Sequence, residues 1–170
     1  MKPIGLFFTG GVESTLLLHD LSLNNKNLNL YTVLNPYINL KRIENIIDHI
    51  NFQNNTKISY PFLIPWKIKN NPDEIFIRWA RHLADVELDV LYIGSNEYME
   101  HLPKRKYISH KKIEIPYKGL YKDTIVEMYI KNDLVQLLNM THSCFTDNEK
   151  HCGYCSGCKE RIWAFMRNNI

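Results

Sequence analysis

Cysteine is missing from most of this 170-residue sequence, because residues 1–143 and 159–170 contain none. All four cysteines fall in one short segment with the spacing Cys-x7-Cys-x2-Cys-x2-Cys. The N-terminus has no secretory signal pattern either, since Met1-Lys2-Pro3 is followed by only a short apolar run before Gly10-Gly11. Disulfides belong to oxidising compartments, so this absence argues against them. We therefore expect a cytoplasmic protein with reduced thiols.

Other absences narrow the class of protein further. No apolar stretch approaches the roughly 20 residues of a membrane span, so we expect no membrane association. The net charge of +3 and the pI near 8.6 are too weakly basic to predict a nucleic-acid partner. Because no repeat, low-complexity segment or linker divides the chain, residues 1–170 are predicted to form a single domain.

The cysteine segment itself predicts a metal site. A Cys-x2-Cys pair turns two sulfurs onto one ion, and four sulfurs complete the tetrahedral shell of structural zinc. We expect residues 141–161 to form a zinc-binding element in which Gly153 and Gly157 allow tight turns between ligands. The predicted ligands are Cys144, Cys152, Cys155 and Cys158.

Two other interpretations of the cysteines stay open besides a disulfide. An iron–sulfur cluster uses similar spacings, although ferredoxin-type runs usually continue to Cys-x3-Cys-Pro, whereas Lys159-Glu160-Arg161 follows here. His151 is a candidate substitute ligand, but four cysteines already fill the shell.

A candidate anion-binding loop lies near the N-terminus. Residues 4–8 form an apolar run typical of a strand buried on both faces, and Thr9-Gly-Gly-Val-Glu-Ser14-Thr15 leads from it into a predicted helix. Glycines let backbone N–H groups approach an anion, hydroxyls add donors, and a helix N-terminus is electropositive. The loop is neither Gly-x-Gly-x-x-Gly nor a Walker sequence, and an ordinary turn is the alternative.

The remaining pattern alternates strands with helices. Further strands are predicted at residues 28–34, 56–64, 90–94 and 112–115. Helices are predicted from about residue 40 to 50, from Pro72 to about 86 with Asn71 as N-cap, and at 123–130. This is an α/β doubly wound fold with five parallel strands. Ligands bind at the carboxyl ends of such strands, which groups residues 9–15 with Leu34-Asn35 and residues 94–97.

The densest basic run is Lys104-Arg105-Lys106 with Lys111 and Lys112. A run of this kind is either a solvated loop or a flap over an anionic ligand.

The two ends of the chain together resemble one family. The segment from Thr9 to Ser14 resembles the Ser-Gly-Gly-x-Asp-Ser loop of the PP-loop ATP pyrophosphatases. The tail Thr-His-Ser-Cys144 … His-Cys152-Gly-Tyr-Cys155-Ser-Gly-Cys158-Lys-Glu-Arg161 is similar to that of the 7-cyano-7-deazaguanine synthases. Tyr37-Ile38, residues 92–96 and residues 122–126 occur in matching order.

The resemblance implies an ATP-dependent carbon–nitrogen ligase with structural Zn²⁺ and with Mg²⁺ as activator. The carboxylate of 7-carboxy-7-deazaguanine would be adenylated, ammonia would form the amide, and a second activation would give the nitrile. The partners implied are the deazapurine, ATP and ammonia, with a homodimer left open. The catalytic residues would be Lys122, Glu13 and Ser14. The nucleotide-binding residues would be Phe8, Thr9, Gly10, Gly11, Glu13, Ser14, Thr15, Leu34, Gly94, Lys122 and Arg161.

The sequence also departs from the family pattern. Thr9 replaces serine and keeps a hydroxyl, and Glu13 replaces aspartate and adds a methylene. The chain is shorter than typical members, and Pro72-Asp73-Glu74 stands where the family has Pro-Gly-Arg-Asn. Two other functional classes are therefore retained, a tRNA-thiolating PP-loop enzyme and a non-catalytic nucleotide-binding paralogue.

Overall fold

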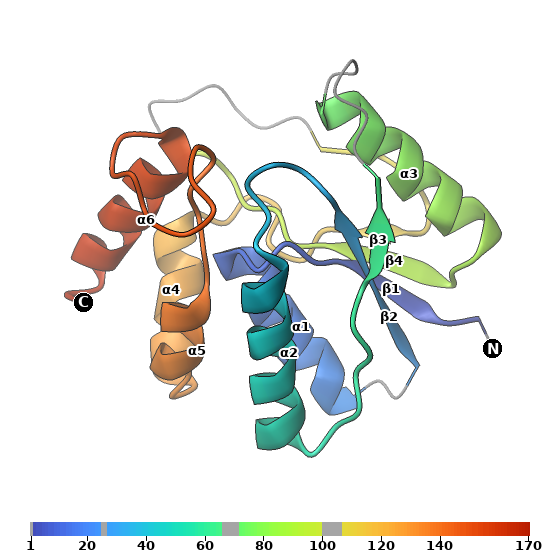
Figure 1. Ribbon diagram of the computed structural model, residues 1–170, viewed down its shortest axis with the longest axis horizontal. Helices are drawn as coiled ribbons and strands as arrows, with labels where there is room; N and C mark the ends of the chain where they lie inside the picture. The colour runs from blue at the N-terminus through green and yellow to red at the C-terminus, as the bar shows by residue number, and fades with distance from the viewer. Residues whose placement is uncertain (1, 25–26, 66–71, 100–106) are drawn as a thin grey trace.

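The computed structural model describes residues 2–24, 27–65, 72–99 and 107–170, with the backbone alone for residues 72–75. Five strands form one sheet in the order β3-β2-β1-β4-β5, and every neighbouring pair is parallel (Figure 1). The strands are β1 (Ile4–Phe7), β2 (Leu28–Val33), β3 (Phe62–Ile64), β4 (Val90–Ile93) and β5 (Ile113–Glu114). The predicted five-stranded parallel α/β sheet is confirmed.

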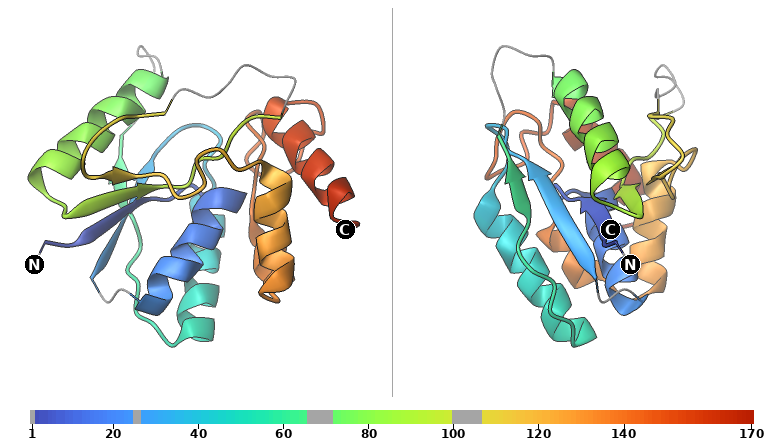
Figure 2. Two further views of the ribbon diagram at one scale, coloured as in Figure 1. Left: turned by 180° about the vertical axis from the view of Figure 1, so that it is seen from behind. Right: turned by 90° about the vertical axis from the view of Figure 1, so that its right-hand side faces the viewer.

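Helices cover both faces of this sheet, as a doubly wound fold requires (Figure 2). They are α1 (Val12–Asn24), α2 (Leu40–Asn54), α3 (Pro72–Val86), α4 (Lys122–Lys131), α5 (Val135–Met140) and α6 (Ser156–Arg167). Helix α3 packs on β4 and β5, whereas α1, α2, α4 and α5 pack together on the opposite face and α6 lies against α4. None of the helices among the described residues has the length and apolar character needed to cross a bilayer.

Strand β1 separates two hydrophobic cores because its side chains alternate between the faces of the sheet. Leu6 and Phe8 pack with the apolar residues of α1, α2 and α4, and both are fully buried. Phe7 points to the other face, where it packs with Ala80 and Leu83 of α3. Burial on both faces explains the uninterrupted apolar run of this strand. The strand therefore holds the loop at its carboxyl end rigidly in the centre of the molecule.

The third strand is much shorter than predicted. The pattern predicted residues 56–64, but only Phe62–Ile64 pair with β2. The side chain of Asn51 in α2 bonds to the backbone of the segment before β3. Its Nδ2 donates to Ile58 O at 2.9 Å, and its Oδ1 accepts from Ile58 N at 2.7 Å. Side-chain bonds of this kind compete with the bonds of a sheet ladder, and here they occupy both backbone groups of Ile58. The prediction was wrong here because apolar pattern alone does not show this competition.

The other predicted elements match the structure to within a few residues, except at the C-terminus. Helix α1 begins at Val12, inside the stretch predicted as a loop. Helices α5 and α6 were not predicted, since they carry short or irregular apolar patterns. The predicted N-cap, Asn71, lies outside the described residues.

Candidate functional site

The loop after β1 leads into the N-terminus of α1 at the carboxyl end of the central strand. Gly10 adopts a left-handed φ of +70°, a conformation that costs glycine little. Thr9 Oγ1 lies 3.1 Å from Ser14 Oγ, and Ser14 Oγ also accepts from Thr9 N at 3.3 Å. These bonds close the loop into a tight turn. The first N–H groups of α1 have no carbonyl partner within the helix, so they form an electropositive edge.

Neighbouring strands hold the loop in place. Thr32 of β2 donates its hydroxyl to Phe8 O at 2.6 Å, and Phe8 N donates to Tyr31 O at 2.9 Å. On the other side, Gly94 at the end of β4 lies so close that a Cβ there would be 2.7 Å from Ser14 N. Tyr129 of α4 donates to Val12 O at 2.7 Å. The start of α1 is thus fixed from three directions.

Lys122 is buried at the first residue of α4, between two carboxylates. Its Nζ lies 2.6 Å from Glu13 Oε1 and 3.1 Å from Glu160 Oε2. Burial by itself would lower the pKa of the ammonium, but Glu13 and Glu160 outweigh burial and raise the pKa above its ordinary value. The ammonium is therefore charged, and it joins α1, α4 and α6. Two of its three donors face these carboxylates.

Arg161 lies inside the protein next to this triad. Its Nη1 donates to Thr141 Oγ1 at 2.7 Å, and its Nη2 donates to Leu138 O at 3.1 Å. Its guanidinium stacks 4.4 Å from the centre of the Phe165 ring. Burial lowers the pKa of Arg161 to about 10, so it stays charged at neutral pH. These contacts tie α6 to the end of α5, and the predicted phosphate contact of Arg161 stays a prediction.

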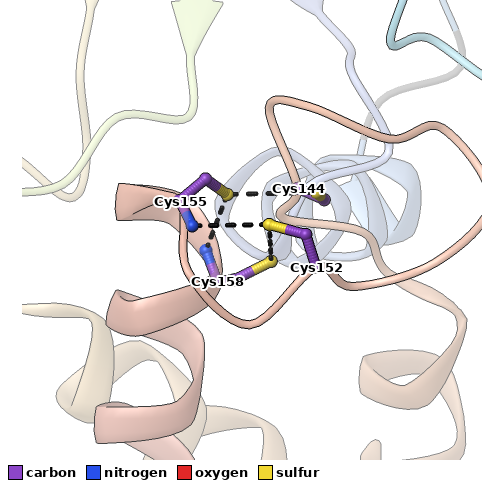
Figure 3. Close-up of side chains that lie close together, drawn as sticks. All are labelled: Cys144, Cys152, Cys155 and Cys158. Carbon is purple, nitrogen blue, oxygen red and sulfur yellow. Dashed lines mark hydrogen bonds between the residues drawn. The ribbon is translucent and has the colours of Figure 1, made fainter.

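The four cysteines meet as predicted (Figure 3). All four Sγ atoms lie within 4.8 Å of one another. The Cys152–Cys158 and Cys144–Cys155 Sγ pairs are each 3.9 Å apart. Four sulfurs at the usual Zn–S distance of about 2.3 Å in a tetrahedron are about 3.8 Å from one another. The sulfur positions therefore fit one structural zinc ion.

Backbone N–H groups complete the surroundings of the sulfurs. Cys155 N donates to Cys152 Sγ and Cys158 N donates to Cys155 Sγ, both at 3.4 Å. Phe145 N donates to the same Cys155 sulfur at 3.5 Å. Bonds of this kind stabilise thiolate charge and orient the ligands.

The two glycines of the cysteine segment have different roles. Gly153 has a φ of +81°, which satisfies the predicted need for a left-handed turn. Gly157 does not have positive φ; instead, a Cβ there would collide with the carbonyl oxygen of Ser143. The absence of a side chain at residue 157 lets the start of α6 pack against the segment that carries Cys144.

The cysteine segment is joined directly to the candidate anion loop. His142 N donates to Gly10 O at 2.9 Å. The His142 ring stacks on His151 with the ring centres 4.6 Å apart, and His151 Nδ1 is 3.7 Å from Cys158 Sγ. Arg42 of α2 fastens the far end of the segment by donating to Asn148 O at 2.9 Å and Glu149 O at 3.0 Å.

A cavity of about 160 Å³ lies beside the loop, between the start of α2 and the cysteine segment. Its walls are Thr9, Asn35, Tyr37, Ile38, Asn39, Arg42, Ile43, His142, Ser143, Cys144 and Phe145. Ser143 is buried, and its Oγ has no hydrogen-bond partner among the described residues.

The structure brings many of the predicted site residues together, while others serve the fold. The segment from Thr9 to Thr15, Gly94 and Lys122 meet around the start of α1. Phe8 is a core residue, and Leu34, which follows β2, donates its N–H to Ile64 O at 2.9 Å. Thr15 is fully buried, and its hydroxyl has no bond partner within the described part of the chain. The basic run 104–106 lies outside the described residues, and Lys112 donates to Leu88 O at 2.9 Å.

Sequence reasoning missed Glu160, Arg42 and Ser143. Glu160 and Lys122 are far apart in sequence, so no spacing rule signals their ion pair. A signal did exist for Glu160, because it follows the predicted metal ligand Cys158 by two positions. Its position next to the metal site made it a candidate for contacts between that site and the rest of the protein.

Comparisons with known proteins agree with the resemblance of the C-terminal segment. The family described as "Queuosine biosynthesis protein QueC" matches residues 92–169. A 7-cyano-7-deazaguanine synthase of Methanobrevibacter smithii is 35% identical over 99 residues, which is 56% of this chain and 41% of that protein. That of Methanosphaera stadtmanae is 34% identical over 80 residues, 45% of this chain and 34% of that protein.

The match to a 7-cyano-7-deazaguanine synthase of Pseudoalteromonas atlantica is 34% identical over 61 residues and covers 36% of this chain and 28% of that protein. In these matches the chain therefore spans well under half of the length of its curated relatives. A solved structure titled as a predicted subunit of tRNA methyltransferase from Methanocaldococcus jannaschii is 15% identical with a TM-score of 0.41, over 77% of this chain and 76% of that chain.

Proposed function

We propose that this chain, which is QueC-like over residues 92–169, uses ATP to activate the carboxylate of 7-carboxy-7-deazaguanine for attack by ammonia. The main support for the proposal is that the family-matched tail contacts the candidate anion loop. His142 of the tail bonds to Gly10 of the loop, and Glu160 of the tail pairs with the Lys122 ammonium that also contacts Glu13. A tail that served only to bind a metal would not need to reach the loop.

The proposed reaction forms an acyl adenylate. A carboxylate oxygen of the substrate attacks the α-phosphorus of ATP, and pyrophosphate leaves. Ammonia then attacks the acyl carbon, and AMP leaves with the carboxylate oxygen to give the amide. A second activation of the amide oxygen, followed by loss of AMP and two protons, gives the nitrile. No protein nucleophile is required, so catalysis rests on positioning and charge neutralisation.

The residues of this chain supply those two effects. The N–H groups at the start of α1 face the position where the phosphates would lie, and the helix dipole favours their negative charge. The third donor of the Lys122 ammonium neutralises charge that develops on the leaving pyrophosphate. Glu13 and Glu160 are both paired with Lys122, so Mg²⁺ would enter on the phosphates of ATP as part of the substrate.

Zinc would be held by Cys144, Cys152, Cys155 and Cys158 and has a structural role in this proposal. Four thiolates close the coordination shell and leave no position for a reacting atom. The same count weighs against the thiolation alternative, since all four cysteines of the sequence belong to the cage and none is left to carry a persulfide.

Pyrophosphate release tests the proposal. We expect the zinc-loaded protein with ATP, Mg²⁺ and ammonium to release pyrophosphate only when 7-carboxy-7-deazaguanine is added. Guanine, which lacks the carboxylate, is the matched control and should give no release. A folded, zinc-loaded protein that releases none with the acid would overturn the proposed function.

A further inference from the structure

The cavity between α2 and the cysteine segment is distinct from the start of α1, which is the proposed binding position of the ATP phosphates. It touches the loop only through Thr9, and its other walls come from the segment after β2, from α2 and from residues 142–145. These walls are fixed by bonds that do not involve a ligand. Asn39 Oδ1 caps α2 by accepting from Arg42 N at 3.0 Å, and Arg42 holds the far end of the cysteine segment. The cavity is therefore preformed.

The size of the cavity limits what it can hold. A dry cavity of about 150 Å³ accommodates one benzene molecule. The volume of about 160 Å³ is thus suited to a planar ring system whose edge extends through the opening. A complete nucleoside triphosphate does not fit.

The lining indicates the chemistry of that ring. Ile38 and Ile43 supply apolar walls, and the exposed side chains of Tyr37 and Phe145 also line the space. The lining residues of the described chain include the cation Arg42 but no aspartate or glutamate. Apolar and aromatic walls with a few polar groups and one guanidinium favour an aromatic heterocycle with polar substituents.

Ser143 gives a second and independent sign of a ligand. Only 7% of the residue is exposed, and its hydroxyl has no partner among the described residues. A buried hydroxyl without a partner is uncommon in folded proteins and calls for an explanation such as a bound molecule. Ser143 sits in the wall of this cavity between His142, which bonds to the loop, and the metal ligand Cys144.

We infer that this cavity binds the purine-like heterocycle of the carboxylated substrate, with its carboxylate turned toward Thr9 and the loop. The inference rests on the proposed function and adds the place and the specificity residues of the acceptor acid. In this position the carboxylate lies on the side of the cavity that adjoins the phosphate end of the site, as adenylation requires. The adenine of ATP has similar ring chemistry, and the experiment separates the two.

Two variants test the cavity by calorimetry on the zinc-loaded full chain. Ser143→Ala removes a hydroxyl that bonds to no described residue, so we expect unchanged thermal stability and a five- to tenfold weaker affinity for 7-carboxy-7-deazaguanine, roughly the loss of one hydrogen bond. Ile38→Trp fills the cavity and should abolish measurable binding of the acid. Both variants should bind Mg²⁺–ATP as the wild type does. Ser59→Ala, at an exposed position outside the cavity, should change neither affinity.

Other outcomes overturn the inference. If the variants weaken ATP binding, alone or together with acid binding, adenine occupies the cavity. If neither affinity changes, or if the wild type does not bind the acid, the cavity is not its site. The proposed function fails separately: an acid that binds with the predicted pattern but triggers no pyrophosphate release leaves the inference standing. If Ser143→Ala still releases pyrophosphate and binds the acid with unchanged affinity, the inference about the cavity is wrong, but the proposed function still holds.

Discussion

At the scale of single residues, Lys122 is the most informative side chain. Its side chain is only 6% exposed and begins at a helix N-terminus, where a cation is unfavourable, so the two carboxylates stabilise its charge. Removing one member of a buried ion group leaves uncompensated charge, which costs about 3–5 kcal/mol. We expect Lys122→Met to lower the free energy of unfolding by that amount in urea denaturation at neutral pH. Lys131→Met in the same helix removes an exposed pair and should cost less than about 1 kcal/mol.

The pH dependence of the Lys122 triad has a defined sign. The pKa of Lys122 in the folded protein is raised above its ordinary value of 10.5. Its contribution to stability is therefore fully present below pH 10.5 and is lost as the pH rises through the folded pKa. We expect the wild type to lose stability in that alkaline range more steeply than Lys122→Met, as measured by urea denaturation. Equal alkaline slopes would show that the ammonium does not titrate in this way.

Gly94 tests whether the end of β4 fixes the anion loop. A Cβ at this position would lie 2.7 Å from Ser14 N and 2.8 Å from Glu13 C, which are backbone atoms of the first turn of α1. We expect Gly94→Ala to cost about 1–3 kcal/mol through overpacking and to weaken ATP binding in calorimetry. Gly11→Ala is the matched comparison, because its nearest contact is the Thr9 hydroxyl at 3.3 Å. It should fold normally and reduce nucleotide binding only by crowding the anion-facing backbone.

At the scale of elements, the cysteine segment is a connector that meets the loop, α2 and α4. Cys155 has a double role, since its sulfur also caps α6 by accepting from Cys158 N. We expect Cys155→Ser to lose zinc and at least about 4 kcal/mol of stability, which corresponds to a melting temperature lower by roughly 8–16 °C. Zinc content by mass spectrometry and thermal melting measure both effects.

His151→Ala is the control for the identity of the ligands. His151 Nδ1 is 3.7 Å from Cys158 Sγ, but four sulfurs already complete the shell. The variant should keep one zinc per chain and bind it nearly as tightly. Loss of zinc from His151→Ala, or its retention in Cys155→Ser, would contradict a cage made of the four cysteines. A brown protein with visible absorbance would instead indicate an iron–sulfur cluster.

The sequence predicts the elements that have a local signal. It does not predict features that depend on contacts between residues far apart in the chain. The apolar run of β1, the Gly-Gly loop and the cysteine spacing each carry their own signal, and all three lie where predicted. The length of β3 depends on Asn51 of α2, whose side chain bonds to the backbone of Ile58 in the segment that was predicted to extend this strand. The pairing of Glu160 with Lys122 and the cavity beside Thr9 arise only when α2, α4 and α6 pack together. Such contacts leave no periodic trace in one sequence.

At the scale of the whole molecule, the fold joins two parts of the chain that are far apart in sequence. The N-terminal loop and the C-terminal metal segment share a hydrogen bond, an ion triad and a cavity wall. The match to QueC covers residues 92–169, and the loop that contacts this part of the chain lies outside that match. The described residues that line the cavity assigned to the acid come from residues 9, 35–43 and 142–145, away from the altered sequence at 72–74.

The mass of the product tests most directly whether this chain uses ATP to join ammonia to the deazapurine acid. Zinc-loaded protein is incubated with ATP, Mg²⁺, ¹⁵N-ammonium and 7-carboxy-7-deazaguanine, and the mixture is analysed by mass spectrometry, with Gly94→Ala in parallel. We expect a ¹⁵N-labelled amide or nitrile of the deazaguanine together with AMP, and much less of both from the variant. Recovery of the unchanged acid, without AMP, from a folded protein that holds its zinc would contradict the proposed ATP-dependent amidation.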